Sequence, residues 1–153
     1  MDKPKFVYVS YIVSTPEKVW NALTDPQMTR KYWGNHHNAS DWIAGSRWEH
    51  RDFDDPKLVD IVGTVIESEY PRRLVVSWAV PKEEGNQAKT SQVTYDIEDF
   101  MGVVRLTVTH DELDQEMYDS ISFGWPAVIS GLKTLLETGT IGAAAGMRPA
   151  NCG

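Results

Sequence analysis

One amphipathic segment near the C-terminus, residues 114–139, constrains the fold more than any other part of the sequence. Apolar residues recur in it at steps of three and four, with polar residues between them, which predicts a helix with one apolar face. The apolar positions are Met117, Ile121, Trp125, Val128, Ile129, Leu132, Leu135 and Leu136. Such a helix needs an apolar surface to lie on. The preceding segments alternate as strands do, so the helix is expected to cover a sheet, and a ligand would bind between the two.

The ends and the middle of this helix carry their own signals. Asp111 and Asp114 are both suitable N-caps, and Gly139 provides a C-terminal stop. Pro126 follows Trp125 inside the pattern, and a proline at this place removes one backbone hydrogen bond. The sequence therefore predicts a kink or a second helix start beside Trp125.

The rest of the chain predicts strands and two short helices. Residues 6–13 are rich in Tyr, Val and Ile and predict a first strand, although both of its faces are apolar. The pairs Thr15-Pro16 and Asp25-Pro26 each predict the start of a short helix. Strands are expected at 47–53, 59–69, 74–80, 91–98 and 104–110. The predicted order is a strand, two short helices, about five antiparallel strands and the long helix.

The segment 35–45 is polar, and we interpret it as a solvated loop. It contains two adjacent histidines, His36 and His37. Neighbouring residues on a strand point to opposite faces, and no partner follows at the spacing of a zinc or iron site. No metal site and no cofactor are predicted.

Composition limits the class of protein. The chain has 153 residues, enough for one domain, which we place at 1–139 with a loose tail at 140–153. The net charge of -7 argues against a nucleic-acid partner. The N-terminus has the pattern of neither a signal peptide nor a membrane span, so a cytoplasmic protein is expected. The single cysteine, Cys152, leaves no intrachain disulfide.

Six tryptophans are the unusual feature of the composition. An indole ring suits the wall of an amphipathic cavity, because it is apolar and carries one N–H donor; filling a core is the alternative use. Inward strand positions and the helix stripe converge on side chains that can hold an apolar ligand. These candidate ligand-binding residues are Tyr32, Trp33, Trp48, Trp78, Tyr95, Leu106, His110, Met117, Ile121 and Trp125.

Several ordered stretches give the chain a family resemblance. They include Thr15 to Pro26, Tyr32-Trp33-Gly34, Pro71-Arg72-Arg73-Leu74, Leu106 to His110, and Gly124-Trp125-Pro126 followed by Leu132 to Gly139. With these motifs the chain resembles the SRPBCC (START-like) superfamily, and within it bacterial members related to the C-terminal domain of the activator of the Hsp90 ATPase. The resemblance implies an α+β helix-grip fold similar to that of Bet v 1, in which a curved antiparallel sheet of about six strands grips the long helix.

The resemblance implies a cavity for a hydrophobic or amphipathic small molecule, with a use in stress response or resistance, and it implies no shared catalytic triad. Two alternatives stay open. One is a chaperone-interaction protein, as the Hsp90 activator is. The other is a cyclase- or hydrolase-like enzyme with His110 as general base and His50 as a second candidate. No Ser or Cys nucleophile is predicted beside either histidine, which favours a wall residue over a catalyst. No membrane partner is expected, the balance leans away from an enzyme without excluding one, and the chain is expected to be a monomer or a homodimer.

Overall fold

The computed structural model describes residues 3–140, which form a single antiparallel sheet with helices packed on one side of it. The strands lie in the order β1-β7-β6-β5-β4-β3-β2, and each neighbouring pair is antiparallel. They are Phe6–Ile12 (β1), His36–Ala39 (β2), Arg47–Asp52 (β3), Val59–Glu69 (β4), Arg73–Trp78 (β5), Ser91–Phe100 (β6) and Val103–Asp111 (β7). The predicted α+β helix-grip architecture is confirmed.

Two short helices follow the first strand, α1 at Pro16–Thr24 and α2 at Pro26–Tyr32. Each begins with a proline, and the side chains of Thr15 and Asp25 accept a backbone N–H from the first turn. These contacts satisfy donors that a helix start leaves unpaired. Both predicted starts are therefore confirmed.

The long helix α3 spans Gln115–Thr138. The carboxylate of Asp114 caps its start, and Gly139 ends it with a left-handed φ of +83°. The helix continues through Pro126, so the second helix start predicted beside Trp125 is wrong. Apolar residues on both sides of the proline are buried against the sheet, and this packing outweighs the roughly 3 kcal/mol that an internal proline costs.

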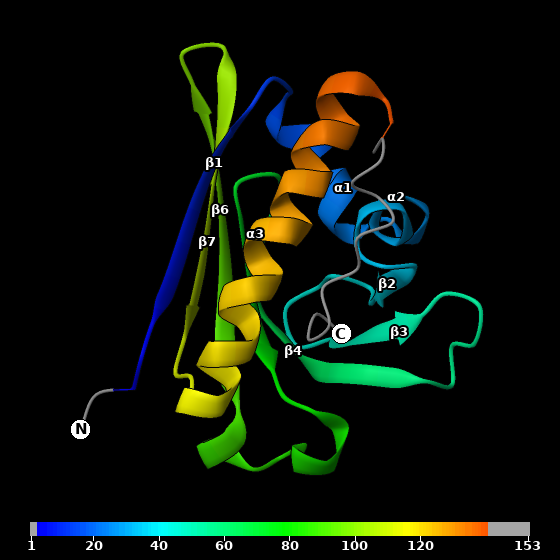
Figure 1. Ribbon diagram of the computed structural model, residues 1–153, viewed down its shortest axis with the longest axis vertical. Coiled ribbons are helices and arrows are strands. Elements are labelled where there is room, and N and C mark those ends of the chain that lie inside the picture. The colour runs from blue at the N-terminus through cyan, green and yellow to red at the C-terminus, as the bar shows by residue number, and fades with distance from the viewer. Residues whose placement is uncertain (1–2, 141–153) are drawn as a thin grey trace.

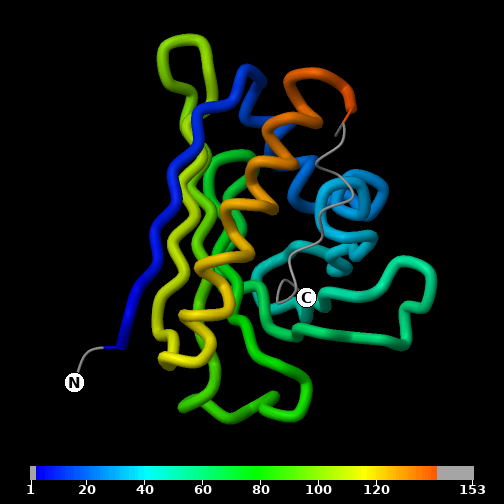
Figure 2. The backbone as a smooth tube through the Cα atoms, in the orientation of Figure 1, coloured from blue at the N-terminus to red at the C-terminus, as the bar shows by residue number. Residues whose placement is uncertain are grey.

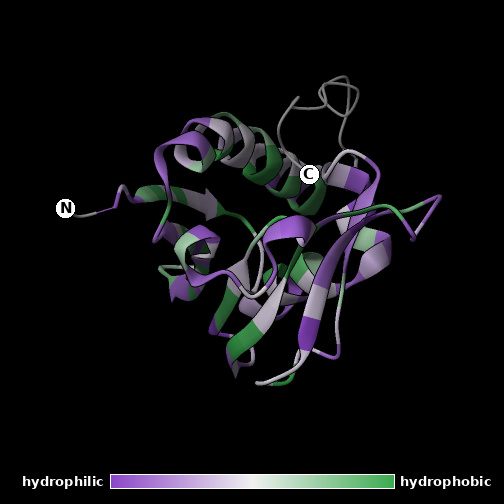
Figure 3. Ribbon diagram, turned by 90° about the horizontal axis from the view of Figure 1, so that it is seen from below, coloured by the Kyte–Doolittle hydropathy of each residue, from purple (hydrophilic) through white to green (hydrophobic). Residues whose placement is uncertain are grey.

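The sheet curls around α3, which lies diagonally across its concave face (Figure 1). The smooth trace shows α1 and α2 beside the C-terminal half of α3, at the end where the β6–β7 hairpin protrudes (Figure 2). In the view from below, hydrophobic and hydrophilic residues alternate along several strands beneath the helix (Figure 3). This alternation lets one face of the sheet form the core while the other meets solvent.

Two side chains of α3 bind the free edge of β1. Lys133 Nζ donates to the backbone oxygen of Tyr11 at 2.6 Å, and Glu137 Oε2 accepts the backbone N–H of Val13 at 2.8 Å. Lys133 and Glu137 also pair with each other at 2.7 Å. The ambiguous parity of β1 is settled by its burial: Ser10 and Ile12 face the core, and the odd-numbered residues face outward.

The interpretation of 35–45 as a solvated loop is wrong for 36–39, which form strand β2 with buried His36, His37 and Asn38. This strand is why the sheet has seven strands instead of about six. The segment between β5 and β6 contains two short 3-10 helices, η1 at Pro81–Glu83 and η2 at Gln87–Lys89. Most of the predicted tail at 140–153 lies outside the described residues. No helix within 3–140 is both long and apolar enough to cross a membrane.

Candidate functional site

Four tryptophans meet between the sheet and α3. Trp33 follows α2, Trp48 lies on β3, Trp78 on β5 and Trp125 on α3, and we call these four residues the tryptophan cluster. Ring centroids are 5.5 Å apart for Trp33 and Trp125, 5.6 Å for Trp78 and Trp125, and 5.5 Å for Trp48 and Trp78. Each residue is at most 4% exposed. Strands, a helix end and a long helix thus bring together rings that are far apart in the sequence.

Some of the other predicted site residues contact this cluster. The ring of Tyr95 lies 6.0 Å from that of Trp125, and the ring of Tyr32 stacks on Trp33 at 6.0 Å. The remaining predicted residues are Leu106, His110, Ile121 and Met117; the first three are buried, and Met117 is half-buried against the core. Nine of the ten predicted residues are therefore buried, and Met117 packs against the core. That they bind a ligand stays a prediction.

A chain of hydrogen bonds links the cluster to β6. Trp125 Nε1 donates to His110 Nδ1 at 3.0 Å, and His110 Nε2 lies 2.8 Å from the hydroxyl of Ser91. That hydroxyl in turn donates to the backbone oxygen of Trp78 at 3.2 Å. An indole nitrogen only donates, so Nδ1 must be the accepting nitrogen and Nε2 must carry the proton. The contacts thereby fix the tautomer of His110.

Burial lowers the pKa of His110 to about 3, so its imidazole is neutral at neutral pH. The prediction that no serine lies beside this histidine is wrong, because Ser91 contacts it directly. In a Ser-His nucleophile pair, Nε2 accepts the serine proton while Nδ1–H is held by a carboxylate. Here the polarity is reversed, since Nδ1 accepts from Trp125 and Nε2 donates to Ser91. This arrangement holds Trp125 in place and leaves the serine without a base.

Ser91 was missed although the sequence contained a signal for it. The alternation of β6 places Ser91 on the same inward face as Val93 and Tyr95. In the hairpin of β6 and β7, Val93 pairs with His110, so Ser91 lies one inward step away. Pairing the two strands expected at 91–98 and 104–110 as a hairpin is sufficient to infer this proximity from the sequence alone.

Trp48 is fixed by a close approach of two strands. Its Nε1 donates to the backbone oxygen of Ser77 at 2.7 Å. A Cβ atom on Gly63 would lie 1.9 Å from that same oxygen and 2.4 Å from Trp48 Nε1. Gly63 permits this close approach, because only a residue without a side chain leaves room for this bond.

Tyr32 closes the cluster on the side of α1. Its hydroxyl donates to the backbone oxygen of Ala22 at 2.6 Å. Burial raises the pKa of Tyr32 well above its usual value, so the side chain remains a neutral phenol. The residue is therefore an anchor between α1 and the core and cannot supply a phenolate.

A polar cluster beside Trp33 explains why β2 forms. His36 Nε2 lies 2.8 Å from Asp60 Oδ2, and His36 Nδ1 lies 2.9 Å from the oxygen of Gly34. His50 stacks on His36 at 5.0 Å, and its Nδ1 lies 2.7 Å from Asn38 Oδ1. Within residues 3–140, no three His, Cys, Asp or Glu side chains come together as a metal ion would require.

A pocket of about 340 Å³ lies at the N-terminal end of α3. Met117 and Val80 line its inner wall, and both pack against the core. Across the pocket, Lys89 Nζ pairs with Asp114 Oδ2 at 3.2 Å. Met117 is thus a predicted site residue that also borders a described pocket, and it connects that pocket with the core.

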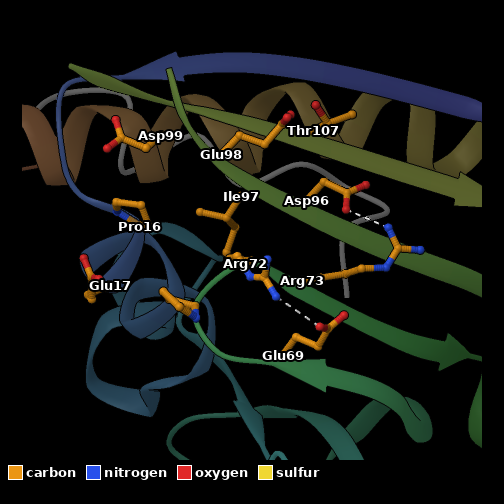
Figure 4. Close-up of a pocket in the computed structure, with 11 residues that line it drawn as sticks. Pro16, Glu17, Glu69, Arg72, Arg73, Asp96, Ile97, Glu98, Asp99 and Thr107 are labelled. Atoms are coloured by element: carbon orange, nitrogen blue, oxygen red, sulfur yellow. Dashed lines mark hydrogen bonds and ion pairs between the residues drawn. The ribbon is translucent and has the colours of Figure 1, made fainter. Parts of the chain in front are cut away.

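A larger groove, of about 830 Å³, lies where α1 meets β5 and β6 (Figure 4). Its arginines are both paired, Arg73 with Asp96 at 2.7 Å and Arg72 with Glu69 at 3.2 Å. The remaining charged residues of its wall are acidic: Glu17, Glu98 and Asp99. None of the ten predicted residues lines this groove, and its charged wall does not suit an apolar ligand.

Comparisons with known proteins agree with this architecture. The sequence model of the family described as activator of Hsp90 ATPase homolog 1-like protein matches residues 14–137. Among curated proteins, none matches the sequence. Several solved structures share the fold at low identity.

CalU16 from Micromonospora echinospora is 20% identical, with a TM-score of 0.69 over 86% of this chain and 65% of that one. PFC0360w, an HSP90 activator from Plasmodium falciparum, is 17% identical, with a TM-score of 0.69 over 86% of this chain and 95% of that one. DynU16, from the dynemicin biosynthetic locus, is 20% identical, with a TM-score of 0.69 over 89% of this chain and 48% of that one. The chain spans just under two thirds of CalU16 and about half of DynU16.

Proposed function

The chain belongs to the activator of Hsp90 ATPase homolog 1-like family, and we propose that it binds a hydrophobic or amphipathic small molecule between the sheet and α3. The observation that carries this proposal is the tryptophan cluster, in which four buried indole rings from four parts of the fold converge on one place. Aromatic walls with few fixed polar partners are typical of sites for apolar ligands.

The rings contact one another in the free protein, so a ligand has to displace at least one of them. Trp125 is the candidate, because Pro126 directly after it cannot donate a backbone hydrogen bond within α3. The pocket beside Met117 is the proposed entrance. Its Lys89–Asp114 pair is partly exposed, and such pairs contribute about 0–1 kcal/mol, so opening it costs little.

The test is a titration of the purified protein with fatty acids, flavonoids and polyketides, followed by tryptophan fluorescence. A ligand that separates the rings should change the emission and bind more tightly than about 100 μM, or about -5.5 kcal/mol. Met117→Ala should weaken binding at the entrance. Arg72→Ala, in the charged groove, is the matched control and should leave the affinity unchanged. The absence of any ligand tighter than about 100 μM across the panel would contradict the proposal.

A chaperone interaction is the second candidate function. It is supported by the family description and by the similarity in fold to PFC0360w, which is described as an HSP90 activator. We rank it lower, because the tryptophan cluster is buried and offers no surface to a protein partner. Pull-down of a bacterial Hsp90 by the purified protein, with a change in the chaperone's ATPase rate, would reverse this ranking.

An enzymatic role for His110 has less support. Both ring nitrogens are engaged, and the polarity of their hydrogen bonds is opposite to that of a general base for Ser91. If a bound ligand is found to be converted, His110→Ala should convert it as fast as the wild type does. A loss of turnover with binding retained would restore the catalytic hypothesis.

A role in stress response or resistance in the cytoplasm fits a protein that sequesters an apolar ligand, because sequestration needs no reaction. Deletion of the gene should then sensitise the cell to the compound that the purified protein binds. Equal growth of the deletion strain and its parent in that compound would argue against this role.

A further inference from the structure

Two indole N–H groups of the tryptophan cluster are buried without an acceptor. Neither Trp33 Nε1 nor Trp78 Nε1 has a hydrogen-bond partner among residues 3–140. The other two indoles of the cluster do have one: Trp48 donates to Ser77 and Trp125 donates to His110. A buried donor that loses its water without gaining a partner destabilises the fold. Two such donors in one ring cluster therefore lack a compensating acceptor within residues 3–140.

Both unpartnered indoles contact the same ring. Trp33 and Trp78 lie on Trp125 at centroid distances of 5.5 Å and 5.6 Å. A molecule that displaces Trp125 would therefore contact both of these indole rings. Its apolar part would contact the indole faces, and oxygen atoms on it could accept the two N–H groups.

The charge of the surroundings restricts the ligand further. No lysine or arginine is among the buried residues of 3–140. His110, which contacts Trp78 and Trp125, is neutral because burial lowers its pKa to about 3. Trp33 also contacts His50, which stacks on His36, and His36 is already paired with Asp60 at 2.8 Å. A carboxylate buried here would lack a counter-ion, which makes its desolvation unfavourable.

We propose that the site takes a neutral, largely aromatic molecule with carbonyl-type oxygens, which accept hydrogen bonds from the indole N–H groups of Trp33 and Trp78. This rests on the proposed binding function and narrows it: quinones and aryl ketones fit the site, whereas fatty acid anions and plain hydrocarbons fit it less well.

The test uses three planar tricyclic probes of the same shape. Anthracene has no acceptor, 9,10-anthraquinone has two carbonyl oxygens, and anthraquinone-2-carboxylate adds a negative charge. Anthraquinone should bind at least about 5-fold more tightly than anthracene, since two hydrogen bonds are gained. The carboxylate should bind at least about 10-fold more weakly than anthraquinone.

Variants then identify the donors. Trp33→Phe and Trp78→Phe keep an aromatic ring but remove the N–H. Each should therefore lower the affinity for anthraquinone by about 2- to 10-fold and leave the affinity for anthracene nearly unchanged. Trp20→Phe is the matched control, because Trp20 lies outside the tryptophan cluster, with its ring 5.5 Å from that of Tyr70. In ¹H–¹⁵N spectra of the wild type, the indole signals of Trp33 and Trp78 should shift on addition of anthraquinone, and the Trp20 signal should not.

The outcomes separate this inference from the function on which it rests. If none of the probes binds and the wider ligand panel also fails, the binding function is wrong and the inference falls with it. Two results would leave the binding function in place but contradict hydrogen bonding of the ligand to Trp33 and Trp78. One is that anthracene binds as tightly as anthraquinone. The other is that Trp33→Phe and Trp78→Phe both leave the ratio of the two affinities unchanged. Equal affinity for the carboxylate would overturn the requirement for a neutral ligand.

The free protein offers a second measurement. Trp33→Phe and Trp78→Phe remove donors that have no partner, whereas Trp48→Phe breaks a bond. The first two should therefore lower the urea midpoint less than Trp48→Phe does. Midpoints lowered by the same amount would mean that Trp33 and Trp78 already have partners in the free protein, which would overturn the inference.

Discussion

Trp125 donates its indole N–H to Nδ1 of His110 at 3.0 Å, across the interface between α3 and β7. This bond joins the long helix to the sheet at the centre of the tryptophan cluster, and it determines which nitrogen of His110 carries the proton. The same bond orients the ring that the proposed ligand would displace. Stability and binding are therefore expected to depend on the same two side chains.

Trp125→Ala should lower the free energy of unfolding by about 3–5 kcal/mol, because the ring is buried and contacts Trp33, Trp78 and Tyr95. Phe123→Ala is the control on the same helix; that ring is 79% exposed, and its removal should change stability by less than about 0.5 kcal/mol. Urea unfolding of both variants measures the difference. A loss below about 2 kcal/mol for Trp125→Ala would indicate that the ring borders open space instead of packed atoms.

His110 predicts how stability depends on pH. Burial lowers its pKa to about 3 from a usual value of 6.5. Between these values the unfolded chain binds the proton and the folded chain does not, so stability is full above about pH 6.5 and falls as the pH drops. The loss approaches about 1.4 kcal/mol per pH unit, or about 2 kcal/mol between pH 6.5 and 5.

The measurement is urea unfolding of the wild type and of His110→Asn, which cannot titrate but keeps an oxygen that can accept from Trp125. The wild type should lose about 2 kcal/mol more than the variant from pH 6.5 to 5, and the difference between the two should stay constant above pH 7.5. If the free energies of unfolding of the two proteins changed in parallel over the whole pH range, His110 would not be the source of the pH dependence.

Alternation and helix signals were enough to predict most of the architecture from the sequence. The parity of β5 and β7 placed Trp78 and His110 inward, and both are buried. The caps at Asp25, Asp114 and Gly139 also lie where local chemistry places them. These features depend on neighbours in sequence, so periodicity and capping preferences are sufficient to find them.

Long-range contacts account for what the sequence did not predict. Strand β2 has little intrinsic strand preference; it forms because His36 meets Asp60 and Asn38 meets His50 across the sheet. The bond between Trp125 and His110 depends on which turn of α3 lies over β7, and that register is set by packing along the whole helix. The continuation of α3 through Pro126 has the same cause.

Gly63→Ala should be strongly destabilising, because the added Cβ would lie 1.9 Å from the backbone oxygen of Ser77. Strands β4 and β5 would have to separate, and Trp48 would lose its hydrogen bond to Ser77, at a cost of about 3 kcal/mol or more. Thr64→Ala, at the next residue of β4 and exposed, should cost less than about 1 kcal/mol. Thermal unfolding of the two variants, followed by circular dichroism, makes the comparison. Similar midpoints would show that the two strands can shift to accept a methyl group.

The Lys133–Glu137 pair is expected to protect the free edge of the sheet. Strand β1 is an edge strand, and its outward side chains Val7, Val9 and Tyr11, together with Val13 directly after the strand, are 44–65% exposed. An apolar edge of this kind can pair with another chain unless its backbone groups are occupied. Lys133 and Glu137 occupy two of them, at Tyr11 and Val13, and the hydrogen bond from Lys133 lowers the pKa of Glu137 so that it stays ionised.

Replacing Lys133 and Glu137 by alanine together should therefore increase self-association through β1, seen as a larger weight-average mass in sedimentation at high concentration than the wild type shows. Glu98→Ala, which removes the Arg105–Glu98 pair, is the control. The hydrogen bonds of that pair join two side chains and occupy no backbone group of the sheet edge. Adding Val9→Lys to the double variant should restore the wild-type mass, since a charge on the edge opposes pairing. A double variant whose mass equals that of the wild type at all concentrations would contradict this role. The edge would then be protected by its twist or by the curvature of the sheet, and Lys133 and Glu137 would only hold α3 against β1.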